Sequence, residues 1–193
     1  MKNLKIYLFR HGQTYYNKNK IFTGWKDSRL TLLGKRQAET ITKKLKDKHI
    51  DIAFQTVLSR SKDTLNIVLK FHPECNEIIT ANRMIERNYG FLEGKSHKTI
   101  FEKYGKEQFE KWHRGWDTPP RKGESFKMVE KRVAIFIKNL IKFMKKNKVN
   151  VCISAHGNSI RLFRKIMENA SIKQICSWNI PYDKYFEYNV KIK

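Results

Sequence analysis

The sequence has few cysteines and no long hydrophobic run. The three cysteines, Cys75, Cys152 and Cys176, lie far apart, are odd in number and follow no spacing typical of a metal site. Cys152 stands inside an apolar segment that predicts a strand, so the simplest interpretation is reduced thiols in a cytoplasm. No apolar run approaches the ~20 residues that a membrane-spanning helix needs, and the first residues lack the pattern of a signal peptide. We therefore expect a cytoplasmic protein without a membrane partner.

Acidic residues are also scarce. Eighteen Asp and Glu stand against 41 Lys and Arg, which gives a formal net charge of +23. Such an excess is typical of proteins that bind nucleic acids or other polyanions. The lysines are spread along the whole chain, however, and there is no zinc-finger spacing, RNA-recognition signature or basic region followed by heptads. We therefore predict no dedicated nucleic-acid partner, and we expect the charge to attract small anionic substrates.

The pattern of apolar residues predicts an α/β fold. Short apolar runs predict strands, and between them apolar residues at helical spacing predict amphipathic helices. This alternation predicts a three-layer sandwich, with a mostly parallel central sheet covered by helices on both faces. We expect a single domain over 1–193 with an inserted helical lobe at about 84–122, where a polar loop and short helical pieces replace the regular pattern. The strands are expected at 4–9, 50–57, 77–80, 149–154 and 185–192.

Two of these strands end in a histidine that is followed by a glycine. The strand at 4–9 leads into His11, and the strand at 149–154 leads into His156. Because the carboxyl ends of parallel strands meet at one edge of a sheet, we expect both imidazoles in one cleft. A neutral imidazole is a good nucleophile, so this edge is a candidate site for group transfer.

Three arginines come from related places. Arg10 precedes the first histidine, Arg60 follows the strand at 50–57, and Arg161 follows the second histidine. Guanidinium groups match phosphate oxygens bidentately, and phosphoryl transfer needs mainly positioning and charge stabilisation. The sequence has no Walker loop and no carboxylate cluster for Mg²⁺. We therefore predict a phosphoryl site without a metal, in which protein groups supply the positive charge.

These residues and several longer stretches follow the order of a known family. They are Arg10-His11-Gly12, Asn17, Arg60, Glu86 and His156, with the stretches 22–27, 85–94, 104–108, 112–120 and 155–159. Together they resemble the histidine phosphatase superfamily, over nearly the whole chain. Arg-His-Gly alone indicates only the superfamily, whereas the stretch 86–94 is similar to the 2,3-bisphosphoglycerate-dependent phosphoglycerate mutases. The fold expected from the apolar pattern agrees with this resemblance.

The resemblance implies a role for each matching residue. His11 would become phosphohistidine, with its Nδ1 proton held by a backbone carbonyl and Nε2 left to attack. Arg10, Arg60 and His156 would bind the transferring phosphoryl group, and Glu86 would be the general acid and base. 2,3-Bisphosphoglycerate would prime the histidine, and the phosphoryl group would then be exchanged between the 2- and 3-oxygens of glycerate. The implied substrate-binding residues are Asn17, Thr23, Gly24, Arg87, Tyr89, Lys98, His113, Arg114, Gly157 and Asn158.

The sequence departs from the family pattern where the substrate's other anionic group would bind. The family usually has two adjacent arginines at the position of His113-Arg114, so one fixed charge is lost. The family lysine falls at His97, and either Lys95 or Lys98 would have to substitute for it. Further along, the usual Thr-Gly is replaced at 182–183 by Tyr-Asp.

Two features bear on assembly and on the outcome of the reaction. The chain runs almost directly from Pro120 into the next helix, without an insertion that takes part in oligomerisation in many members. This resembles the short, monomeric members, so we expect a monomer rather than an oligomer. The sequence stops at Lys193 without a tail to close over the site. An open site would admit water to the phosphohistidine.

Three functions therefore remain open. A small phosphorylated substrate is isomerised by a mutase and hydrolysed by a phosphatase, through the same phosphohistidine. The specific stretch 86–94 favours the mutase, and the missing tail favours the phosphatase. A non-catalytic module that binds an anion or a protein is the third possibility, supported by the charge. The complete set of His11, Glu86 and His156 argues against it.

Overall fold

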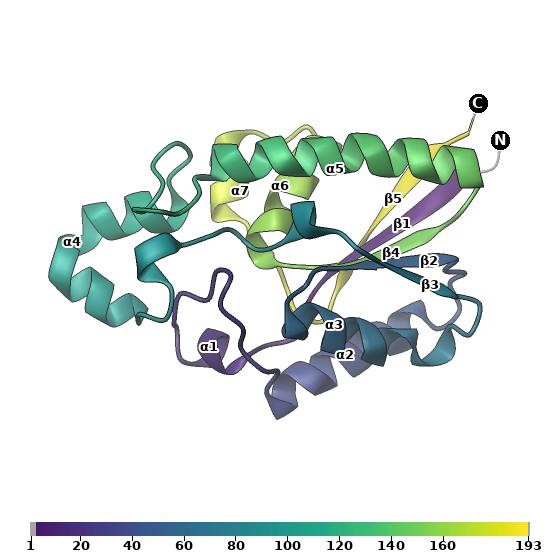
Figure 1. Ribbon diagram of the computed structural model, residues 1–193, viewed down its shortest axis with the longest axis horizontal. Coiled ribbons are helices and arrows are strands. Elements are labelled where there is room, and N and C mark those ends of the chain that lie inside the picture. Colours follow the sequence, from purple (N-terminus) through teal and green to yellow (C-terminus); the bar gives the residue numbers. More distant parts are fainter. Residues whose placement is uncertain (1–2, 193) are drawn as a thin grey trace.

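A five-stranded sheet in the order β3-β2-β4-β1-β5 forms the centre of the computed structural model, which describes residues 3–192 (Figure 1). All neighbouring strands are parallel except β1 and β5, which pair antiparallel. The mostly parallel sheet expected from the sequence is thus confirmed. The strands are β1 (Asn3–Arg10), β2 (Ile52–Gln55), β3 (Glu77–Thr80), β4 (Val151–Ala155) and β5 (Tyr185–Lys191).

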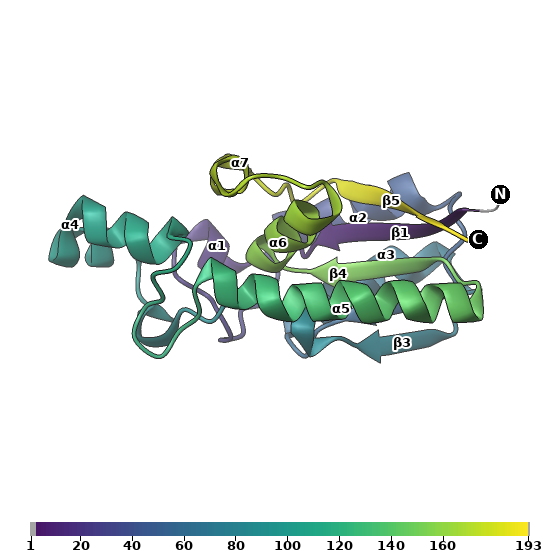
Figure 2. The same ribbon diagram turned by 90° about the horizontal axis from the view of Figure 1, so that it is seen from above.

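Helices cover both faces of the sheet, as Figures 1 and 2 show. Side chains alternate along β1, so Ile6 and Leu8 face one layer of helices, while Tyr7 and Phe9 face the other. The first layer contains α5 (Phe126–Asn147), α6 (Gly157–Met167) and α7 (Ile172–Ser177). The second contains α2 (Leu32–Leu45) and α3 (Ser59–Val68). Each fully buried aliphatic or aromatic side chain contributes roughly 1.5–3 kcal/mol, so the two cores fix the strand register.

Beyond the strand ends, a smaller apolar cluster supports a projecting helix. In both views α4 (His97–Arg114) lies past the arrowheads of the parallel strands, on the same side as the short α1 (Tyr15–Lys18). Phe22, Leu92, Ile100 and Phe109 form this cluster together with Tyr89. Gly105 interrupts α4 with φ +76°, a left-handed conformation that favours glycine. Two 3₁₀ turns, η2 (Asn82–Met84) and η3 (Gly90–Leu92), lead from the sheet to α4, and η1 (Leu69–Phe71) extends α3.

Two short helices differ from the expectation that the sequence raised. Between the strand expected at 4–9 and the one expected at 50–57 lies the short α1, whose cap Thr14 accepts a hydrogen bond from the backbone N–H of Asn17 and whose apolar pattern is too short to be recognised. Helix α7 has only Ile175 buried, so its apolar pattern is too weak to be recognised in the sequence. Among the helices of residues 3–192, none combines the length and apolar character needed to cross a lipid bilayer.

Candidate active site

A cavity of about 210 Å³ opens where β1 and β4 end and α4 begins. Its walls come from the first residues after the strands, from α1 and α4, and from the loop before β5. Twelve of the expected site residues line it: Arg10, His11, Asn17, Thr23, Gly24, Arg60, Glu86, Tyr89, His113, Arg114, Gly157 and Asn158. The structure thus gathers residues from distant parts of the chain around one space.

His11 is held by backbone groups immediately after β1. Its own N–H donates to the carbonyl of Ala155 at 3.0 Å, which continues the pairing of β1 with β4. Nδ1 lies 2.7 Å from the carbonyl oxygen of Gly12. A carbonyl can only accept, so Nδ1 carries the proton and the lone pair is on Nε2. A Cβ at Gly12 would collide with the carbonyl of Gly34, so glycine is required for this loop to pack against α2.

The surroundings of His11 keep its ring neutral. Its side chain is only 2% exposed. Burial lowers the pKa of His11 well below 6.5, and the positive charges of Arg60 and Arg10 lower it further. At neutral pH the ring is therefore a neutral base in the cavity wall, with its proton on Nδ1 and its lone pair on Nε2. This is the state that a nucleophile requires.

His156 lies beside the nucleophile at the start of α6. The two imidazole centroids are 5.1 Å apart, and His156 is fully buried. Its Nε2 shares a 2.8 Å hydrogen bond with the Thr56 hydroxyl, whereas Nδ1 is buried without a partner among residues 3–192. Burial, then the charges of nearby arginines and the neighbouring histidine, lower the pKa of His156 well below 6.5. His156 is not among the residues that line the cavity, so its contact with the site runs through the His11 ring.

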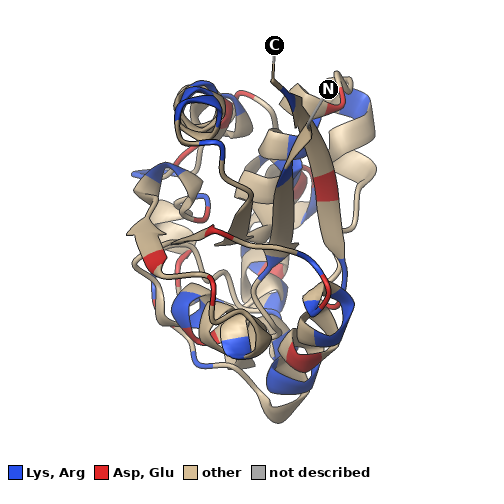
Figure 3. Ribbon diagram, turned by 90° about the vertical axis from the view of Figure 1, so that its right-hand side faces the viewer, with Lys and Arg blue, Asp and Glu red and all other residues tan. Residues whose placement is uncertain are grey.

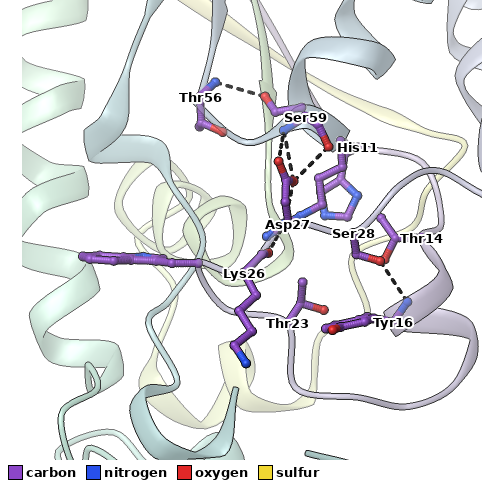
Figure 4. Close-up of polar contacts among 12 residues, drawn as sticks. His11, Thr14, Tyr16, Thr23, Lys26, Asp27, Ser28, Thr56 and Ser59 are labelled. Atoms are coloured by element: carbon purple, nitrogen blue, oxygen red, sulfur yellow. Dashed lines mark hydrogen bonds and ion pairs between the residues drawn. The ribbon is translucent and has the colours of Figure 1, made fainter. Parts of the chain in front are cut away.

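Arg60 is fully buried at the first turn of α3. Its Nη1 donates to the carbonyl of Lys26 at 2.9 Å, and its Nη2 donates to the carbonyl of Gly24 at 2.8 Å. Burial lowers the pKa of Arg60 to about 10, so the guanidinium remains charged at neutral pH. Asp27 fastens the same loop to α3, since its carboxylate accepts from the backbone and hydroxyl of Ser59, as Figure 4 shows. A carboxylate at a helix N-terminus is favourably placed relative to the helix dipole.

Arg10 is held by the loop that precedes β5. Nη1 donates to the carbonyl of Ile180 at 2.9 Å, and the guanidinium carbon lies 3.9 Å from the centre of the Tyr182 ring. Nε is buried and has no partner among the described residues. A Cβ added to Gly157 would lie 3.3 Å from the guanidinium carbon, so this glycine allows α6 to begin close to Arg10. Arg10 therefore presents donors to the cavity from a fixed position.

Glu86 lines the cavity from the segment between η2 and η3. It is 8% exposed, and its Oε1 accepts hydrogen bonds from the backbone N–H of Arg87 at 2.8 Å and of Asn158 at 3.1 Å. Its carbonyl accepts from the indole of Trp25 and from Arg132. The carboxylate is thus held by the backbone at the N-terminus of α6, rather than by an ion pair with the Arg87 side chain.

Two residues of the expected substrate-binding set do not reach the cavity. Arg87 is fully buried, and its guanidinium donates to the carbonyls of Glu124, His113 and Trp112. It therefore joins α4 to the start of α5. Lys98 points outward from α4, with a side chain that is 83% exposed and 3.8 Å from Glu102. The structure offers Lys20, from the turn after α1, as the lysine that lines the cavity.

Several residues that line the cavity were not in the expected set. Arg161 was recognised as coming from a related place, and its position four residues after Gly157 on α6 is a usable signal. His97 and Tyr182 stand out only as departures from the family pattern. Lys20 is one cation among 41, so nothing in the sequence distinguishes it. The additional lining residues are Tyr16, Lys20, Ile21, Phe22, His97, Arg161, Asn179, Ile180 and Tyr182.

The outer end of the cavity contains two facing imidazoles. The rings of His97 and His113 have centroids 5.1 Å apart, and His97 also packs against Phe22 at 4.2 Å. Burial is the main cause that lowers the pKa of His97 to about 4 and of His113 to about 3, and the charge of Arg114 adds to both effects. Both rings are neutral at pH 7, where the family usually has permanent cations. The fixed charges here come from Arg114, Lys20 and Arg161.

The cations that surround the cavity are therefore side chains of the protein. Across residues 3–192 there is no group of three or more His, Cys, Asp or Glu side chains placed to hold a metal ion. Burial lowers the pKa of Arg161 to about 10, so this guanidinium also stays charged. Its Nη1 donates to Oδ1 of Asn158 at 2.6 Å, and the Asn158 amide in turn donates to the Tyr89 hydroxyl at 3.1 Å.

Comparisons with known proteins agree with this geometry. The model of the histidine phosphatase superfamily (branch 1) matches residues 6–189. A 2,3-bisphosphoglycerate-dependent phosphoglycerate mutase of Parvibaculum lavamentivorans is 39% identical over 184 residues, which cover 93% of this chain and 87% of that protein. A protein of the same name from Cytophaga hutchinsonii is 38% identical over 189 residues, covering 97% and 89%.

Solved structures share the fold. A phosphoglycerate mutase from Bacillus anthracis superimposes with a TM-score of 0.75 at 24% identity, covering 87% of this chain and 81% of that chain. A putative alpha-ribazole-5'-P phosphatase from Escherichia coli superimposes with a TM-score of 0.82 at 20% identity, covering 95% and 89%. Because these identities are below 25%, the two structures support the three-layer fold and nothing about the function.

Proposed function

This chain belongs to the histidine phosphatase superfamily, and we propose that it is a phosphoglycerate mutase that interconverts 3-phosphoglycerate and 2-phosphoglycerate. Curated relatives that are 34–39% identical to it over at least 91% of this chain bear the name of the 2,3-bisphosphoglycerate-dependent enzyme. The observation that carries the proposal is a neutral imidazole, His11, in one cavity with the carboxylate of Glu86 and with buried arginines.

The unpartnered polar atoms of the site fit a phosphorylated ligand. Five buried side-chain nitrogens of residues 3–192 have no hydrogen-bond partner; three of them belong to arginines that line the cavity and a fourth to His156, beside His11. These four are Nε of Arg10, Nε of Arg60, Nε of Arg161 and Nδ1 of His156. Leaving a buried donor unpaired costs about 1–3 kcal/mol, so such a group gains from a bound anion. Phosphoryl oxygens offer the acceptors that these nitrogens lack.

We assign the chemistry to His11 and Glu86. Bound 2,3-bisphosphoglycerate supplies the phosphoryl group that primes the enzyme. Nε2 of His11 forms its bond to phosphorus as the bond from phosphorus to the glycerate oxygen breaks. The Glu86 carboxyl gives its proton to the departing oxygen and later takes the proton of the attacking hydroxyl. Arg10 and Arg60 stabilise the charge on the transferring oxygens.

We further propose how the remaining groups hold the substrate. Asn17 comes from α1, and Thr23 and Gly24 come from the loop whose carbonyls bind Arg60; all three line the cavity and would contact the transferring group. At the outer end Arg114, Lys20 and Arg161 would bind the second anionic group of the substrate. We expect the enzyme to act as a cytoplasmic monomer on a small phosphorylated substrate.

Hydrolysis through the same phosphohistidine is the second candidate. The observation in its favour is the pair of neutral rings, His97 and His113, where the family usually has cations. A weaker hold on the second anionic group would shorten the time that an intermediate stays bound. Water would then compete with the glycerate hydroxyl for the phosphoryl group.

One assay separates the two reactions. The enzyme is supplied with 3-phosphoglycerate and a trace of 2,3-bisphosphoglycerate, and 2-phosphoglycerate and inorganic phosphate are measured separately. We expect isomerisation to exceed phosphate release, and we expect acid-labile phosphate on the wild type but not on a His11→Ala variant. Release of phosphate without 2-phosphoglycerate would refute the mutase and leave the phosphatase. An absence of labelled protein in both samples would refute both enzymes.

A further inference from the structure

The segment 176–182 is attached to three arginines of the cavity. Carbonyl oxygens at every second residue of this segment each accept a hydrogen bond from a different guanidinium. The bonds run from Nη1 of Arg114 to Cys176 at 3.3 Å, from Nη2 of Arg161 to Trp178 at 2.8 Å and from Nη1 of Arg10 to Ile180 at 2.9 Å. Cys176 belongs to the last turn of α7, whereas Trp178 and Ile180 lie in the stretch that follows the helix, which begins with Trp178 in an extended conformation. The segment thus anchors one nitrogen of each guanidinium. Arg161 is also held through Nη1 by Oδ1 of Asn158, and the nitrogens of these guanidiniums that are buried without a partner among the described residues are Nε of Arg10 and Nε of Arg161.

Tyr182 completes this arrangement with its side chain. The guanidinium carbon of Arg10 lies 3.9 Å from the centre of the Tyr182 ring, and the ring lines the cavity at a centroid distance of 6.4 Å from the His11 ring. A hydrogen bond at Nη1 fixes one point of the guanidinium, whereas stacking fixes its plane. The two contacts together determine where the unpaired Nε of Arg10 points.

We propose that Tyr182 is a positioning residue for phosphoryl transfer, and that it acts by holding the plane of the Arg10 guanidinium against the transferring group. The inference rests on the proposed transfer at His11. Donors that are fixed before charge develops stabilise a transition state more than donors that must first be ordered. The Thr-Gly that the family usually has at 182–183 offers no ring face for this contact, so the device belongs to this chain.

The chain offers a matched control for the stacking. The ring of Phe186, four residues later on β5, lies 4.3 Å from the guanidinium carbon of Arg164. Arg164 pairs with Glu168 and does not line the cavity. Phe186→Leu therefore removes an arginine–aromatic contact from the same part of the fold, between two residues that do not line the cavity, and Arg164 keeps its contact with the Trp178 ring.

The test measures single-turnover phosphorylation of His11 by labelled 2,3-bisphosphoglycerate, over a range of donor concentrations. Cation–π contacts correspond to roughly 2- to 30-fold in rate, so we expect Tyr182→Leu to lower the maximal rate about tenfold. The donor concentration for half-maximal rate should change much less, because Arg114 and Arg161 keep their carbonyl anchors. Tyr182→Phe keeps the ring and should restore the rate, and Phe186→Leu should match the wild type.

Several outcomes decide the matter. Equal rates for Tyr182→Leu and Phe186→Leu would overturn the proposal, as would a Tyr182→Phe variant as slow as Tyr182→Leu. A change confined to the half-saturating concentration would overturn it too, because it would indicate ordinary binding. Should the leucine variant fail to fold, Tyr182→Thr, the residue usual at this position, replaces it with the same expected slowing. A wild type that is phosphorylated but forms no 2-phosphoglycerate would refute the mutase, while the rate comparison would still decide on Tyr182.

Discussion

At the scale of single residues, two groups of opposite character share the cavity. His11 is a neutral base because burial and two nearby arginines oppose its protonation. Glu86 is an acid or base whose Oε1 is fixed by two backbone N–H groups, from Arg87 and Asn158. The backbone thus fixes the place of each group before a ligand arrives. In the proposed reaction, His11 accepts and returns a phosphoryl group, and Glu86 gives and takes a proton.

Replacing the Glu86 carboxylate by an amide tests the proton transfer. In Glu86→Gln the side-chain oxygen can still accept from Arg87 and Asn158, so the shape of the site is kept. The amide cannot exchange a proton, and general acid–base catalysis contributes about 10²- to 10⁴-fold. We expect kcat of isomerisation to fall by about two orders of magnitude or more, with little change in KM. Steady-state kinetics give both constants, and an equal change in the two would contradict the role.

Arg87 and Lys98 show the limit of inference from sequence at this scale. Both stand in or beside segments that match the family, and both were expected to bind substrate. Arg87 instead donates to three carbonyls in the protein interior, and Lys98 points into solvent. The direction of a side chain depends on the helix phase and on the loops that pack against it. Neither can be derived from the identity of the residue.

At the scale of elements, strand ends were predictable and short helices were not. The five strands and the placing of His11 and His156 at one sheet edge follow from apolar periodicity and from parallel pairing. The position of α4 cannot be predicted in this way. It depends on a small apolar cluster in which Phe22 packs with Leu92 and with residues of α4, and Phe22 is far from the others in the sequence. The meeting of His97 with His113 is a consequence of that attachment.

The two histidines of α4 should make the protein sensitive to acid. Their pKa values are lowered to about 4 and about 3 in the folded state, against 6.5 in the unfolded chain. Below pH 6.5 the two imidazoles become protonated in the unfolded chain but stay neutral in the folded protein. The free energy of unfolding therefore falls as the pH falls toward 4. The slope for each ring stays below about 1.4 kcal/mol per pH unit, because each ring takes up at most one proton. Screening by solvent reduces it further, since both rings are partly exposed.

Denaturant unfolding at pH 7 and pH 5 measures this loss. His11 and His156 contribute in the same direction and remain in every variant, so the comparison uses the double variant His97→Gln and His113→Gln. We expect the difference in unfolding free energy between the two pH values to be smaller in the double variant than in the wild type. An identical difference would mean that the α4 histidines titrate normally in the folded protein.

At the scale of the whole molecule, the positive charge extends well beyond the cavity. Lys and Arg occur on helices and loops around the sheet, as Figure 3 shows. A net charge of +23 on a protein of this size attracts anions from all directions. The composition indicated this field, whereas the cavity that receives the anion follows only from the fold.

The field should accelerate the encounter with substrate and leave the chemical step unchanged. Electrostatic steering raises association rates by about 10- to 1,000-fold at low salt, and the Debye length shrinks to about 10 Å at 0.1 M. We expect kcat/KM for 3-phosphoglycerate to fall several-fold from low to moderate ionic strength, while the single-turnover rate of phosphorylation at saturating donor stays constant. Charge reversal at Lys145 and Lys146, in the last turn of α5 and outside the cavity lining, should weaken the salt dependence of kcat/KM without changing that rate. If salt lowers the single-turnover rate as strongly as kcat/KM, the ions act by occupying the phosphate site itself, and the net charge has no steering role.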